Sequence, residues 1–379
     1  MEMFPLAAPV HTTTEQDRRH MAAALALSRR HLGRTWPNPS VGCVIVRDGY
    51  VVGRGVTAPG GRPHAETEAL KQAGVAAKGG TAYVTLEPCA HQGETAPCCD
   101  ALVDAGVSRV VIALGDPDPR TAGAGIARLD AAGISVTIGV GEEEARELHA
   151  GFLCRITLGR PLVTLKVAAS LDGNVATASG DSQWITGALA REQGHLLRAE
   201  NDGIIVGGGT ARQDDPSLTC RLPGLRASTP VRIVCDSDLS LSLQSKLVES
   251  AGDHPTWLFG AEDADGERRM ALEDRGVDIV EVPRTSDGGL DPYAVFACLG
   301  ERGMTRLLVE GGPTWGSALL RAGLVDRLAW FFASVALGGD AKAAVGELDL
   351  QRLADAATWR VLSRSVLGDD TLVMLARQG

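Results

Sequence analysis

Four residues in the first hundred have the types and the spacing of a hydrolytic metal site. His64 and Glu66 lie two positions apart, and Cys89 and Cys98 follow along the chain. A catalytic zinc ion takes three protein ligands and leaves its fourth position to water, whose pKa falls to roughly 7 on the metal. His64, Cys89 and Cys98 would be the ligands, and Glu66 would carry protons from the water to the departing ammonia. The set predicts a zinc-dependent hydrolytic deaminase.

Two further residues compete for the ligand positions. The simplest deaminase signature is P-C-x-x-C, whereas eight residues separate Cys89 from Cys98. Cys99 is the neighbour of Cys98 and would point differently in a helix, so the sequence does not exclude a swap. His91 is interpreted as a pocket-wall or loop residue, because a fourth protein ligand would close the site to water. The alternative for the cysteines is a purely structural role, since free cysteine is commonly buried.

The elements around these residues are predicted from the apolar pattern. Residues 82–86 form an apolar run typical of a buried strand, which would place Cys89 at a strand's carboxyl end. Residues 98–106 predict a helix whose N-terminus holds Cys98 and favours a thiolate there. Upstream, Thr14 can cap a helix that reaches about Leu32.

The whole chain alternates strand and helix patterns, which predicts an α/β protein. Because 379 residues exceed what one core usually supports, we expect two domains, 1–158 and 159–379, divided at the breaker cluster Gly159-Arg160-Pro161. A helix over about 142–152 precedes this boundary. Strands are expected in the first half at 41–46, 82–86, 110–114 and 136–140, in a largely parallel sheet. They are expected in the second half at 162–168, 203–206, 231–235, 256–259, 277–282 and 306–309, with antiparallel strands at 328–335, 359–365 and 371–376.

Two glycine-rich turns follow predicted strands of the second half, at 207–210 and 310–314. Glycine lets backbone N–H groups approach a phosphate at a helix N-terminus. Such turns are also common as plain connections. Neither turn has the G-x-G-x-x-G pattern, so a classical dinucleotide-binding fold is not predicted.

Composition excludes several classes of protein. The chain has 37 Lys and Arg against 47 Asp and Glu, a net charge of −10, which disfavours a nucleic-acid partner but allows a local pocket for one phosphate. Its eight cysteines do not form the framework of a short secreted protein, and residues 1–14 lack the pattern of a signal peptide. No apolar run reaches the ~20 residues of a membrane span. We therefore expect a cytoplasmic protein with no membrane partner.

Ordered motifs over almost the whole chain resemble the bifunctional riboflavin biosynthesis proteins, which fuse a pyrimidine deaminase to a 5-amino-6-(5-phosphoribosylamino)uracil reductase. The first half matches in the stretches 37–42, 64–66, 85–91 and 97–99. The second half matches in 166–173, 179–186, 214–216, Leu218, Arg221 and 309–314.

For the first half, the resemblance implies a cytidine deaminase-like three-layer αβα fold. The reaction would release ammonia from 2,5-diamino-6-ribosylamino-4(3H)-pyrimidinone 5′-phosphate. His64, Cys89 and Cys98 match the family's zinc ligands, Glu66 its proton shuttle, and Asn38 a pocket residue that holds the base.

For the second half, the resemblance implies a dihydrofolate reductase-like αβα fold, in which NADPH reduces C1′ of the ribosylamino group, opened to its imine form. Substrate contacts fall on Ser182, Arg198, Leu218, Arg221 and Glu310, with Arg198 and Arg221 as anchors for the 5′-phosphate. Cofactor contacts fall on Ala168, Trp184, Thr210, Asp214, Ser237, Gly312, Pro313, Thr314, Trp315, Gly316, Ser317 and Ala318. Lys166 and Asp172 are candidates near the site of hydride transfer.

The chain departs from the family pattern at three positions that bear on the deaminase substrate. Near Thr57 the family commonly has a histidine, Glu94 stands where Lys or Arg is usual, and Ala96 replaces proline. An acidic Glu94 near a phosphorylated substrate is repulsive unless it faces solvent or a cation compensates.

Two other classes of function compete with the bifunctional enzyme. A nucleic-acid deaminase would share the zinc half but leaves residues 160–379 unexplained and conflicts with the acidic charge. A non-catalytic zinc scaffold has no need of Glu66 beside an open ligand position. The family habit also leads us to expect a homo-oligomer, a dimer or tetramer.

Overall fold

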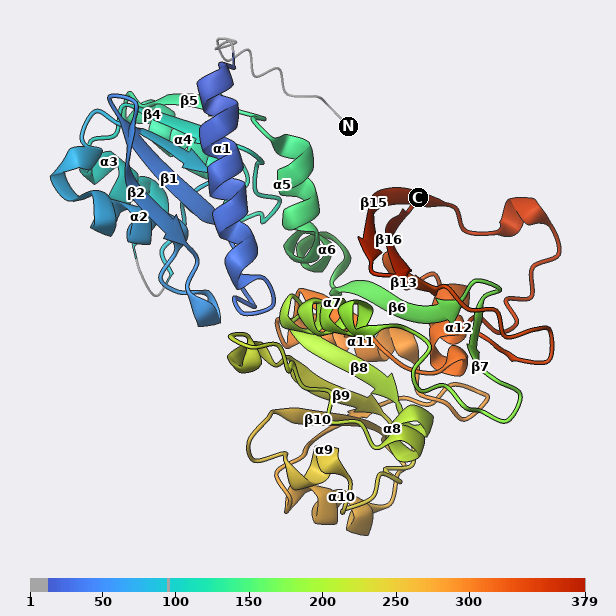
Figure 1. The fold of residues 1–379 in the computed structure, drawn as a ribbon. Helices are drawn as coiled ribbons and strands as arrows, with labels where there is room; N and C mark the ends of the chain where they lie inside the picture. Colours follow the sequence, from blue (N-terminus) through green and yellow to red (C-terminus); the bar gives the residue numbers. More distant parts are fainter. Residues whose placement is uncertain (1–12, 94–95, 379) are drawn as a thin grey trace. The chain divides into compact units, whose positions relative to one another are not determined.

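A computed structural model describes residues 13–93 and 96–378 of the chain (Figure 1). It divides into two compact units, Met1–Leu158 and Gly159–Gly379. Among the described residues, no helix is both long and apolar enough to cross a membrane.

The first unit is built on a five-stranded sheet in the order β2-β1-β3-β4-β5. The strands are β1 (Gly42–Arg47), β2 (Tyr50–Val56), β3 (Thr81–Val84), β4 (Arg109–Ile112) and β5 (Ser135–Ile138). The helices are α1 (Glu15–Ser28), α2 (Ala65–Ala73), α3 (Cys98–Asp104), α4 (Ala124–Ala131), α5 (Glu142–Leu148) and α6 (Ala150–Leu158), with short 3-10 turns at Arg29–His31, Pro59–Gly61 and Gly74–Ala77.

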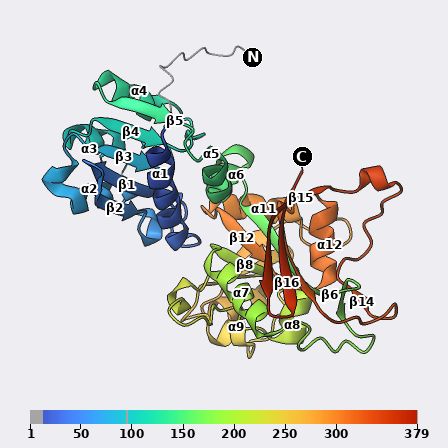
Figure 2. The ribbon, with the colours of Figure 1, turned by 45° about the horizontal axis from the view of Figure 1, so that its top comes forward.

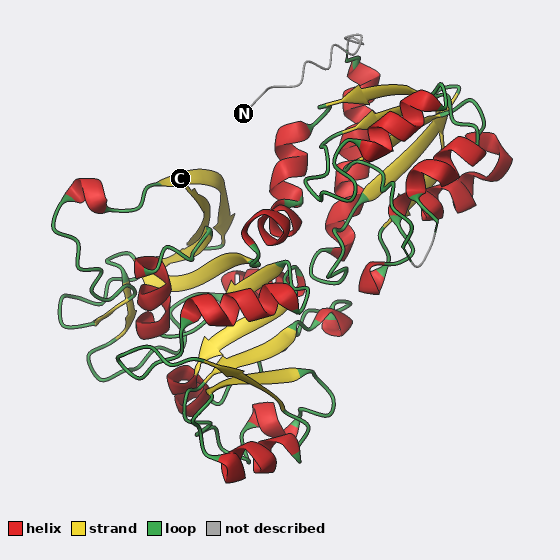
Figure 3. Ribbon diagram, turned by 180° about the vertical axis from the view of Figure 1, so that it is seen from behind, coloured by secondary structure: helices red, strands yellow, loops and turns green. Residues whose placement is uncertain are grey.

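The helices of this unit form two layers around the sheet. Helix α1 packs on β1 and β3 and contacts α5. Helix α2 packs on β2 and β1 and contacts α3, which in turn contacts α4. Figure 3 shows the sheet of this unit between its helices. The expected three-layer αβα arrangement is therefore confirmed.

The relative directions of the strands in this sheet differ from the prediction. Strands β3, β4 and β5 are parallel, but β1 runs antiparallel to both β2 and β3, so the sheet is not largely parallel. Strand β2 was not predicted. It is joined to β1 by Asp48 and Gly49, whose φ angles of 52° and 80° are left-handed, the conformation that favours an Asp-Gly hairpin turn.

One predicted helix of this unit begins where expected, and another is divided into two. Thr14 caps α1 as expected: its hydroxyl accepts from the backbone N–H of Asp17, and the Asp17 carboxylate accepts from the backbone N–H of Thr14. The helix expected over 142–152 is instead two helices, α5 and α6, because His149 lies between them outside α-helical geometry (φ −89°, ψ 5°).

A buried charge cluster ties α1 to the sheet. The Asp17 carboxylate, whose residue is 1% exposed, accepts two hydrogen bonds from the Arg109 guanidinium of β4, at 2.8 and 3.2 Å. The Tyr83 hydroxyl of β3 donates a third bond at 3.0 Å. Burial alone would raise the pKa of Asp17, but these hydrogen bonds outweigh it and lower the pKa to about 2.

The second unit is built on a nine-stranded sheet in the order β11-β10-β9-β8-β12-β6-β13-β16-β15. Its strands, with a separate pair β7 and β14, are β6 (Leu162–Ser170), β7 (Asn174–Ala176), β8 (Gly203–Gly207), β9 (Val231–Cys235), β10 (Thr256–Ala261), β11 (Asp278–Val282), β12 (Arg306–Val309), β13 (Arg327–Ala333), β14 (Lys342–Ala343), β15 (Trp359–Leu367) and β16 (Asp370–Arg377). Its helices are α7 (Ala188–Ala199), α8 (Gly208–Asp214), α9 (Lys246–Glu249), α10 (Gly266–Glu273), α11 (Pro292–Glu301) and α12 (Pro313–Arg321), with 3-10 turns at Arg226–Ser228 and Leu353–Asp355.

Seven neighbouring strands of this sheet, from β11 to β13, are parallel. The predicted antiparallel hairpin of β15 and β16 completes the sheet beside β13 (Figure 2). Strand β13 was expected among the antiparallel strands, but it pairs parallel to β6 and antiparallel only to β16. Because parallel strands end at one edge, the turns after β6, β8, β9 and β12 lie at the same edge of the sheet, where open α/β sheets bind ligands.

We expect Asp17→Asn to destabilise the first unit by about 2 kcal/mol, because a pKa lowered from 3.8 to about 2 corresponds to that order of free energy. The melting temperature of this unit should fall by roughly 4–8 °C in calorimetry. The deficit should be full above about pH 4 and shrink as the pH falls toward 2, because wild-type Asp17 then becomes protonated too. Glu15→Gln, an exposed carboxylate on the same helix, is the control; equal melting of both variants would contradict the role of Asp17.

Candidate active sites

The structure brings His64, Cys89 and Cys98 together in the first unit. His64 is the N-cap of α2, Cys98 is the first residue of α3, and Cys89 lies in the loop that follows β3. The Nδ1 atom of His64 lies 3.3 Å from the Cys98 Sγ and 3.7 Å from the Cys89 Sγ. Within 13–93 and 96–378, this is the one group of three such side chains whose ligand atoms all lie within 4.8 Å of one another.

The donor set fits a zinc ion. Ligand atoms on a tetrahedral zinc, at ~2.0–2.1 Å for nitrogen and ~2.3 Å for sulfur, are separated by roughly 3.5–3.8 Å, close to the two distances measured from Nδ1. One imidazole and two thiolates are ligands that zinc prefers, and three protein ligands leave the fourth position open. Cys89 and Cys98 are also in direct contact, because the Cys98 backbone N–H donates to the Cys89 Sγ at 3.3 Å.

The two thiols affect each other's pKa in opposite directions. The pKa of Cys89 is lowered to about 4, chiefly because the Cys98 thiol donates a hydrogen bond to its sulfur. The pKa of Cys98 is raised by the same hydrogen bond and by burial. The backbone N–H of Cys98, at the N-terminus of α3, also donates to the Cys89 sulfur and contributes to lowering the pKa of Cys89.

Glu66 lies on the first turn of α2 and is 3% exposed. Burial raises the pKa of Glu66 to about 7. A carboxyl group with that pKa exchanges its proton near neutral pH, which is what a general acid and base requires. It lines the same cavity as His64 and Cys89.

The rival ligands lie elsewhere. Cys99 is fully buried in the hydrophobic core of the unit, and its Sγ donates to the Asp100 carboxylate at 3.8 Å. The Nδ1 of His91 lies 3.3 Å from the Thr121 hydroxyl. Neither residue belongs to the metal-ligand group, and His91 lines the cavity as the sequence suggested.

A cavity of about 110 Å³ is lined by His64, Cys89 and Glu66. It includes Asn38, whose amide donates to the Gly61 carbonyl at 2.9 Å, and Thr57, whose hydroxyl accepts from the Val41 backbone N–H at 2.9 Å. The Thr57 hydroxyl is thereby used to hold the backbone where the family commonly has histidine. Glu94 and Thr95 lie outside the described residues.

Sequence reasoning missed several residues that line this cavity, among them Arg62, Asp116, Asp118 and Arg120. Burial raises the pKa of Asp116 to about 6. The Asp-Pro-Asp-Pro stretch directly after the turn that follows β4 is the signal that could have found the two aspartates, since polar residues after a parallel strand lie at the ligand-binding edge.

In the second unit, a cavity of about 170 Å³ is lined by a largely buried ion pair. The Arg198 guanidinium donates to both oxygens of Glu310, from Nε at 2.7 Å and from Nη2 at 2.9 Å. Burial would raise the pKa of Glu310, but the charges of Arg198 and Lys166 outweigh it and lower the pKa to about 2. Glu310 is therefore a fixed negative charge between two cations.

The predicted substrate residues of this unit have different surroundings. Arg198 uses its remaining Nη1 for the Thr219 carbonyl at 2.9 Å, so its donors face protein acceptors. Arg221 is exposed at the same cavity, where its Nε donates to His195 at 3.3 Å. Leu218 has its side chain in the core and a left-handed φ of 51°, so contact with a ligand would come from its backbone. Ser182 is exposed and lies outside the cavity lining.

Trp184 is 67% exposed rather than part of the core. Its ring stacks under the Arg191 guanidinium at 4.9 Å from the ring centroid and lines the same cavity as Lys166 and Glu310. Asp172, in contrast, accepts from the backbone N–H groups of Leu337 and Gly338. It thus holds a loop, whereas Lys166 remains beside the cavity.

The two glycine-rich turns of this unit meet at the ligand-binding edge. The Gly312 backbone N–H, at the N-cap of α12, donates to the Thr210 hydroxyl of α8 at 3.0 Å. Ala168, Gly312, Pro313 and Gly316 line a second cavity of about 150 Å³. Two helix N-termini side by side at glycine turns are suited to a diphosphate.

One atom at this edge also lacks a protein partner. The Nε1 of Trp315 is buried with no hydrogen-bond partner among the described residues. A nicotinamide dinucleotide, rich in acceptor oxygens, fits this arrangement of donors. Thr314, Ser317 and Ala318 share the helix with Trp315, although the Ser317 hydroxyl accepts from the Gly346 backbone N–H at 2.8 Å.

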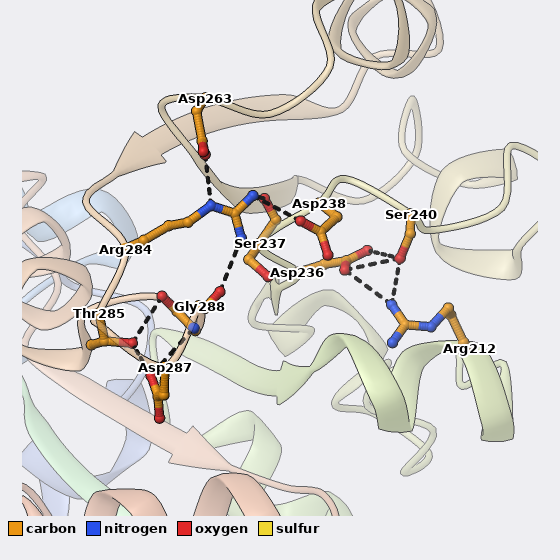
Figure 4. A network of polar contacts seen from close by, with 11 residues as sticks. Arg212, Asp236, Ser237, Asp238, Ser240, Asp263, Arg284, Thr285, Asp287 and Gly288 are labelled. Atoms are coloured by element: carbon orange, nitrogen blue, oxygen red, sulfur yellow. Dashed lines mark hydrogen bonds and ion pairs between the residues drawn. The ribbon is translucent and has the colours of Figure 1, made fainter.

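Ser237 lies farther along the same edge, within a polar network (Figure 4). Its carbonyl accepts from Arg284 Nη2 at 3.4 Å, and Arg284 also pairs with Asp238 and Asp263. On the other side of Ser237, Arg212 Nη1 donates to Asp236 and to the Ser240 hydroxyl. Asp214 ends α8, and its pKa is raised by partial desolvation.

Both units match known protein families. Residues 14–114 match the cytidine and deoxycytidylate deaminase zinc-binding region, and residues 161–373 match the RibD C-terminal domain. The chain is 43% identical to the riboflavin biosynthesis protein RibD of Escherichia coli (strain K12), covering 95% of this chain and 99% of that protein. It is 39% identical to the RibD protein of Aquifex aeolicus (strain VF5), covering 96% and 99%.

Solved structures agree over the same length. The structure resembles Acinetobacter baumannii RibD, form 1, with a TM-score of 0.86 and 38% identity, covering 96% of this chain and 99% of that one. It also resembles a diaminohydroxyphosphoribosylaminopyrimidine deaminase/5-amino-6-(5-phosphoribosylamino)uracil reductase from Thermotoga maritima, with a TM-score of 0.82, 32% identity and the same coverage. The chain therefore belongs to the RibD family of bifunctional riboflavin biosynthesis enzymes, with a zinc-dependent deaminase unit followed by a dihydrofolate reductase-like unit that uses NAD(P)H.

Proposed function

We propose that the first unit deaminates 2,5-diamino-6-ribosylamino-4(3H)-pyrimidinone 5′-phosphate and that the second unit reduces the resulting 5-amino-6-(5-phosphoribosylamino)uracil to the ribitylamino product. The observation that carries the first step is the convergence of His64, Cys89 and Cys98, two of which line one cavity with buried Glu66. The Thermotoga relative, which matches over both units, is named for these two activities.

In the deaminase unit, His64, Cys89 and Cys98 would hold the zinc ion. When bound, the ion supplies a Lewis acid that acidifies a water molecule. Glu66 would accept one proton as water adds to the ring carbon that carries the amino group, and it would pass that proton to the amino nitrogen as the carbon–nitrogen bond breaks and ammonia leaves. Asn38, at the same cavity, orients the base.

In the reductase unit, the nicotinamide cofactor supplies a hydride for C1′ of the open-chain imine. Ala168, Trp184, Thr210 and the start of α12 would bind it, with Asp214 and Ser237 farther along the edge. Glu310 stays ionised beside Lys166 and Arg198, so its carboxylate would offer the substrate a hydrogen-bond acceptor. Arg221 supplies the exposed charge for the 5′-phosphate, while Arg198 keeps Glu310 in place; Ser182 and Leu218 complete the proposed substrate contacts.

We also propose NADPH rather than NADH as the reductant. The support is the position of Arg212, whose side chain is 46% exposed near Ser237 and uses Nη1 for its bonds to Asp236 and Ser240. Its Nε and Nη2 have no hydrogen-bond partner within the described residues and could pair with a 2′-phosphate.

Two further proposals concern the oligomeric state and the cellular location of the protein. We propose a homo-oligomer, a dimer or tetramer, on the resemblance to the family, which light scattering would test. We propose a cytoplasmic location, supported by the eight cysteines, all of them free thiols, as expected in a reducing compartment.

The proposed function is tested by a paired assay on the zinc-loaded protein with the diaminopyrimidinone ribotide. Ammonia release should not require NADPH, and NADPH oxidation should follow only after deamination. Oxidation of NADPH without prior ammonia release would contradict the proposed order, and absence of ammonia release would contradict the proposed deaminase substrate.

We expect Glu66→Gln to lower the rate of ammonia release by about 10²–10⁴-fold, the usual contribution of a general acid and base. Zinc content, measured by elemental analysis, and reduction of pre-deaminated substrate should stay unchanged. Glu68→Gln, on the same turn of α2, is the matched control. Deaminase activity that survives the Glu66→Gln substitution would rule out the assigned role.

We expect Cys98→Ala to lose zinc and deaminase activity, because two protein ligands hold the ion far more weakly than three. Cys99→Ala should keep one zinc per first unit, since its thiol faces the core. Chelation of the wild type should likewise abolish ammonia release and leave NADPH oxidation on pre-deaminated substrate intact. Loss of zinc on Cys99→Ala, with retention on Cys98→Ala, would reverse the ligand assignment.

We expect Arg212→Ala to weaken NADPH binding about tenfold or more while leaving NADH binding unchanged, because a hydrogen bond to a charged group contributes about 1.5–3 kcal/mol. The dissociation constants are measured by cofactor fluorescence. Arg226→Ala, in a 3-10 turn outside this network, is the control. Equal weakening for both cofactors would contradict the proposed contact with a 2′-phosphate.

A further inference from the structure

His195 lines the reductase cavity and has no part in the proposed hydride transfer. It lies on α7, one turn before Arg198, and borders the same cavity as Arg221 and Glu310. Its side chain is half-buried. An imidazole can carry a charge, transfer a proton or accept a hydrogen bond, and its surroundings decide among the three.

The contacts of His195 join α7 to the segment 218–221. The Cys220 thiol donates to the His195 carbonyl, with 3.4 Å between sulfur and oxygen. The Arg221 backbone nitrogen lies 3.4 Å from the His195 Nδ1, and the Arg221 Nε lies 3.3 Å from the His195 Nε2. Two consecutive residues of the segment are therefore held against one position of the helix.

The imidazole of His195 is an acceptor at neutral pH. Burial and the charges of Arg198 and Arg221 lower its pKa, and they outweigh the opposing effect of Glu310. A neutral imidazole has one acceptor nitrogen, so it accepts from one of the two Arg221 donors at a time, whereas an imidazolium accepts from neither. His195 thus adds an acceptor to the cavity rather than another positive charge.

The contact at Nε leaves the outer edge of the Arg221 guanidinium free. Arg221 is exposed, and neither Nη1 nor Nη2 has a protein partner within the described residues. These two nitrogens can pair with two oxygens of a phosphate. A long, exposed side chain loses rotamer freedom when it binds a ligand, and a bond that already holds Nε reduces that loss.

Arg198 shows what a different partner does to an arginine of the same cavity. Its Nε and Nη2 donate to Glu310, and its Nη1 donates to the Thr219 carbonyl, so its guanidinium is used within the protein. Glu310 is the one carboxylate that lines this cavity in the described part of the chain. A carboxylate beside Arg221 would cancel the charge that a phosphate requires, whereas a neutral imidazole orients the guanidinium and preserves its charge.

We propose that His195 is a positioning residue of the reductase, which accepts a hydrogen bond from Arg221 and holds its guanidinium toward the 5′-phosphate of the substrate. The proposal rests on the proposed function of the second unit, in which Arg221 supplies the charge for that phosphate. It adds the group through which Arg221 is oriented. His195 acts through Arg221 and does not touch the reacting atoms.

A double-mutant cycle tests whether His195 acts through Arg221. NADPH oxidation is followed on the full zinc-loaded chain with pre-deaminated ribotide. His195→Leu should raise KM about three- to tenfold, the size of one hydrogen bond, with kcat unchanged. His195→Gln, whose amide keeps an acceptor, should stay within about twofold of the wild type. In the Arg221→Gln background, His195→Leu should have no further effect.

Gln193→Leu is the matched control, because Gln193 lies on the same helix but outside the cavity lining. It should keep the wild-type KM. Ammonia release and the dissociation constant for NADPH report, for every variant, on whether the two units have folded.

The Arg221 Nε–H group gives a readout that needs no substrate. In protein labelled with ¹⁵N-arginine, the Nε–H signal that Arg221→Gln removes identifies this group in NMR spectra. Its exchange with water should be slow in the wild type and in His195→Gln. It should be several-fold faster in His195→Leu, because water then replaces the imidazole as the acceptor.

Equal effects of His195→Leu on KM with and without Arg221 would overturn the positioning role, as would an unchanged Nε–H exchange rate in His195→Leu. A loss in His195→Gln as large as that in His195→Leu would overturn it too, because the amide retains the acceptor. Wild-type protein that does not oxidise NADPH with the pre-deaminated ribotide overturns the proposed function instead. The exchange measurement still decides the contact between His195 and Arg221, so the two failures are distinguishable.

Discussion

The close packing of helix α2 on strand β2 positions the deaminase site. A Cβ atom on Gly55 would lie 2.0 Å from the Ala65 carbonyl oxygen, and one on Gly53 would lie 2.2 Å from the Ala69 carbonyl oxygen. Only glycine allows the helix backbone this close to the strand. Because His64 is the N-cap of this helix and Glu66 lies on its first turn, the contact fixes a metal ligand and the proposed proton carrier together.

The reductase unit has a corresponding constraint at the carboxyl edge of its parallel sheet. Glu310 follows β12 and Arg198 lies on α7, and their two hydrogen bonds join a sheet edge to a helix across 112 residues of chain. Removal of one partner from such a largely buried pair leaves an uncompensated charge, which is far more costly than the pair is stabilising. The pair is therefore better understood as a device that fixes a charge beside the cavity than as a source of stability.

The features predicted most accurately from the sequence are those that a local pattern of residues determines. Residues 231–235 and 306–309 are strands with the predicted limits, because a short apolar run bounded by turn residues determines both ends of a strand. The zinc triad was likewise predicted from the types of its ligands and their order in the chain. Strand β2 was missed because much of it is at least partly exposed and its Asp-Gly turn is short. The partners of Arg198 and the placement of Arg62 depend on contacts between distant segments, and no local pattern reports them.

Two glutamates show how burial alone does not determine a role. Glu66 is buried beside sulfur ligands and its pKa is raised to about 7, so it can accept and donate a proton at neutral pH. Glu310 is largely buried too, but two cations lower its pKa to about 2, so it stays charged throughout the neutral range. The same side chain thus has a pKa near neutrality in one unit and stays ionised in the other, and the difference comes from the cations that lie within reach.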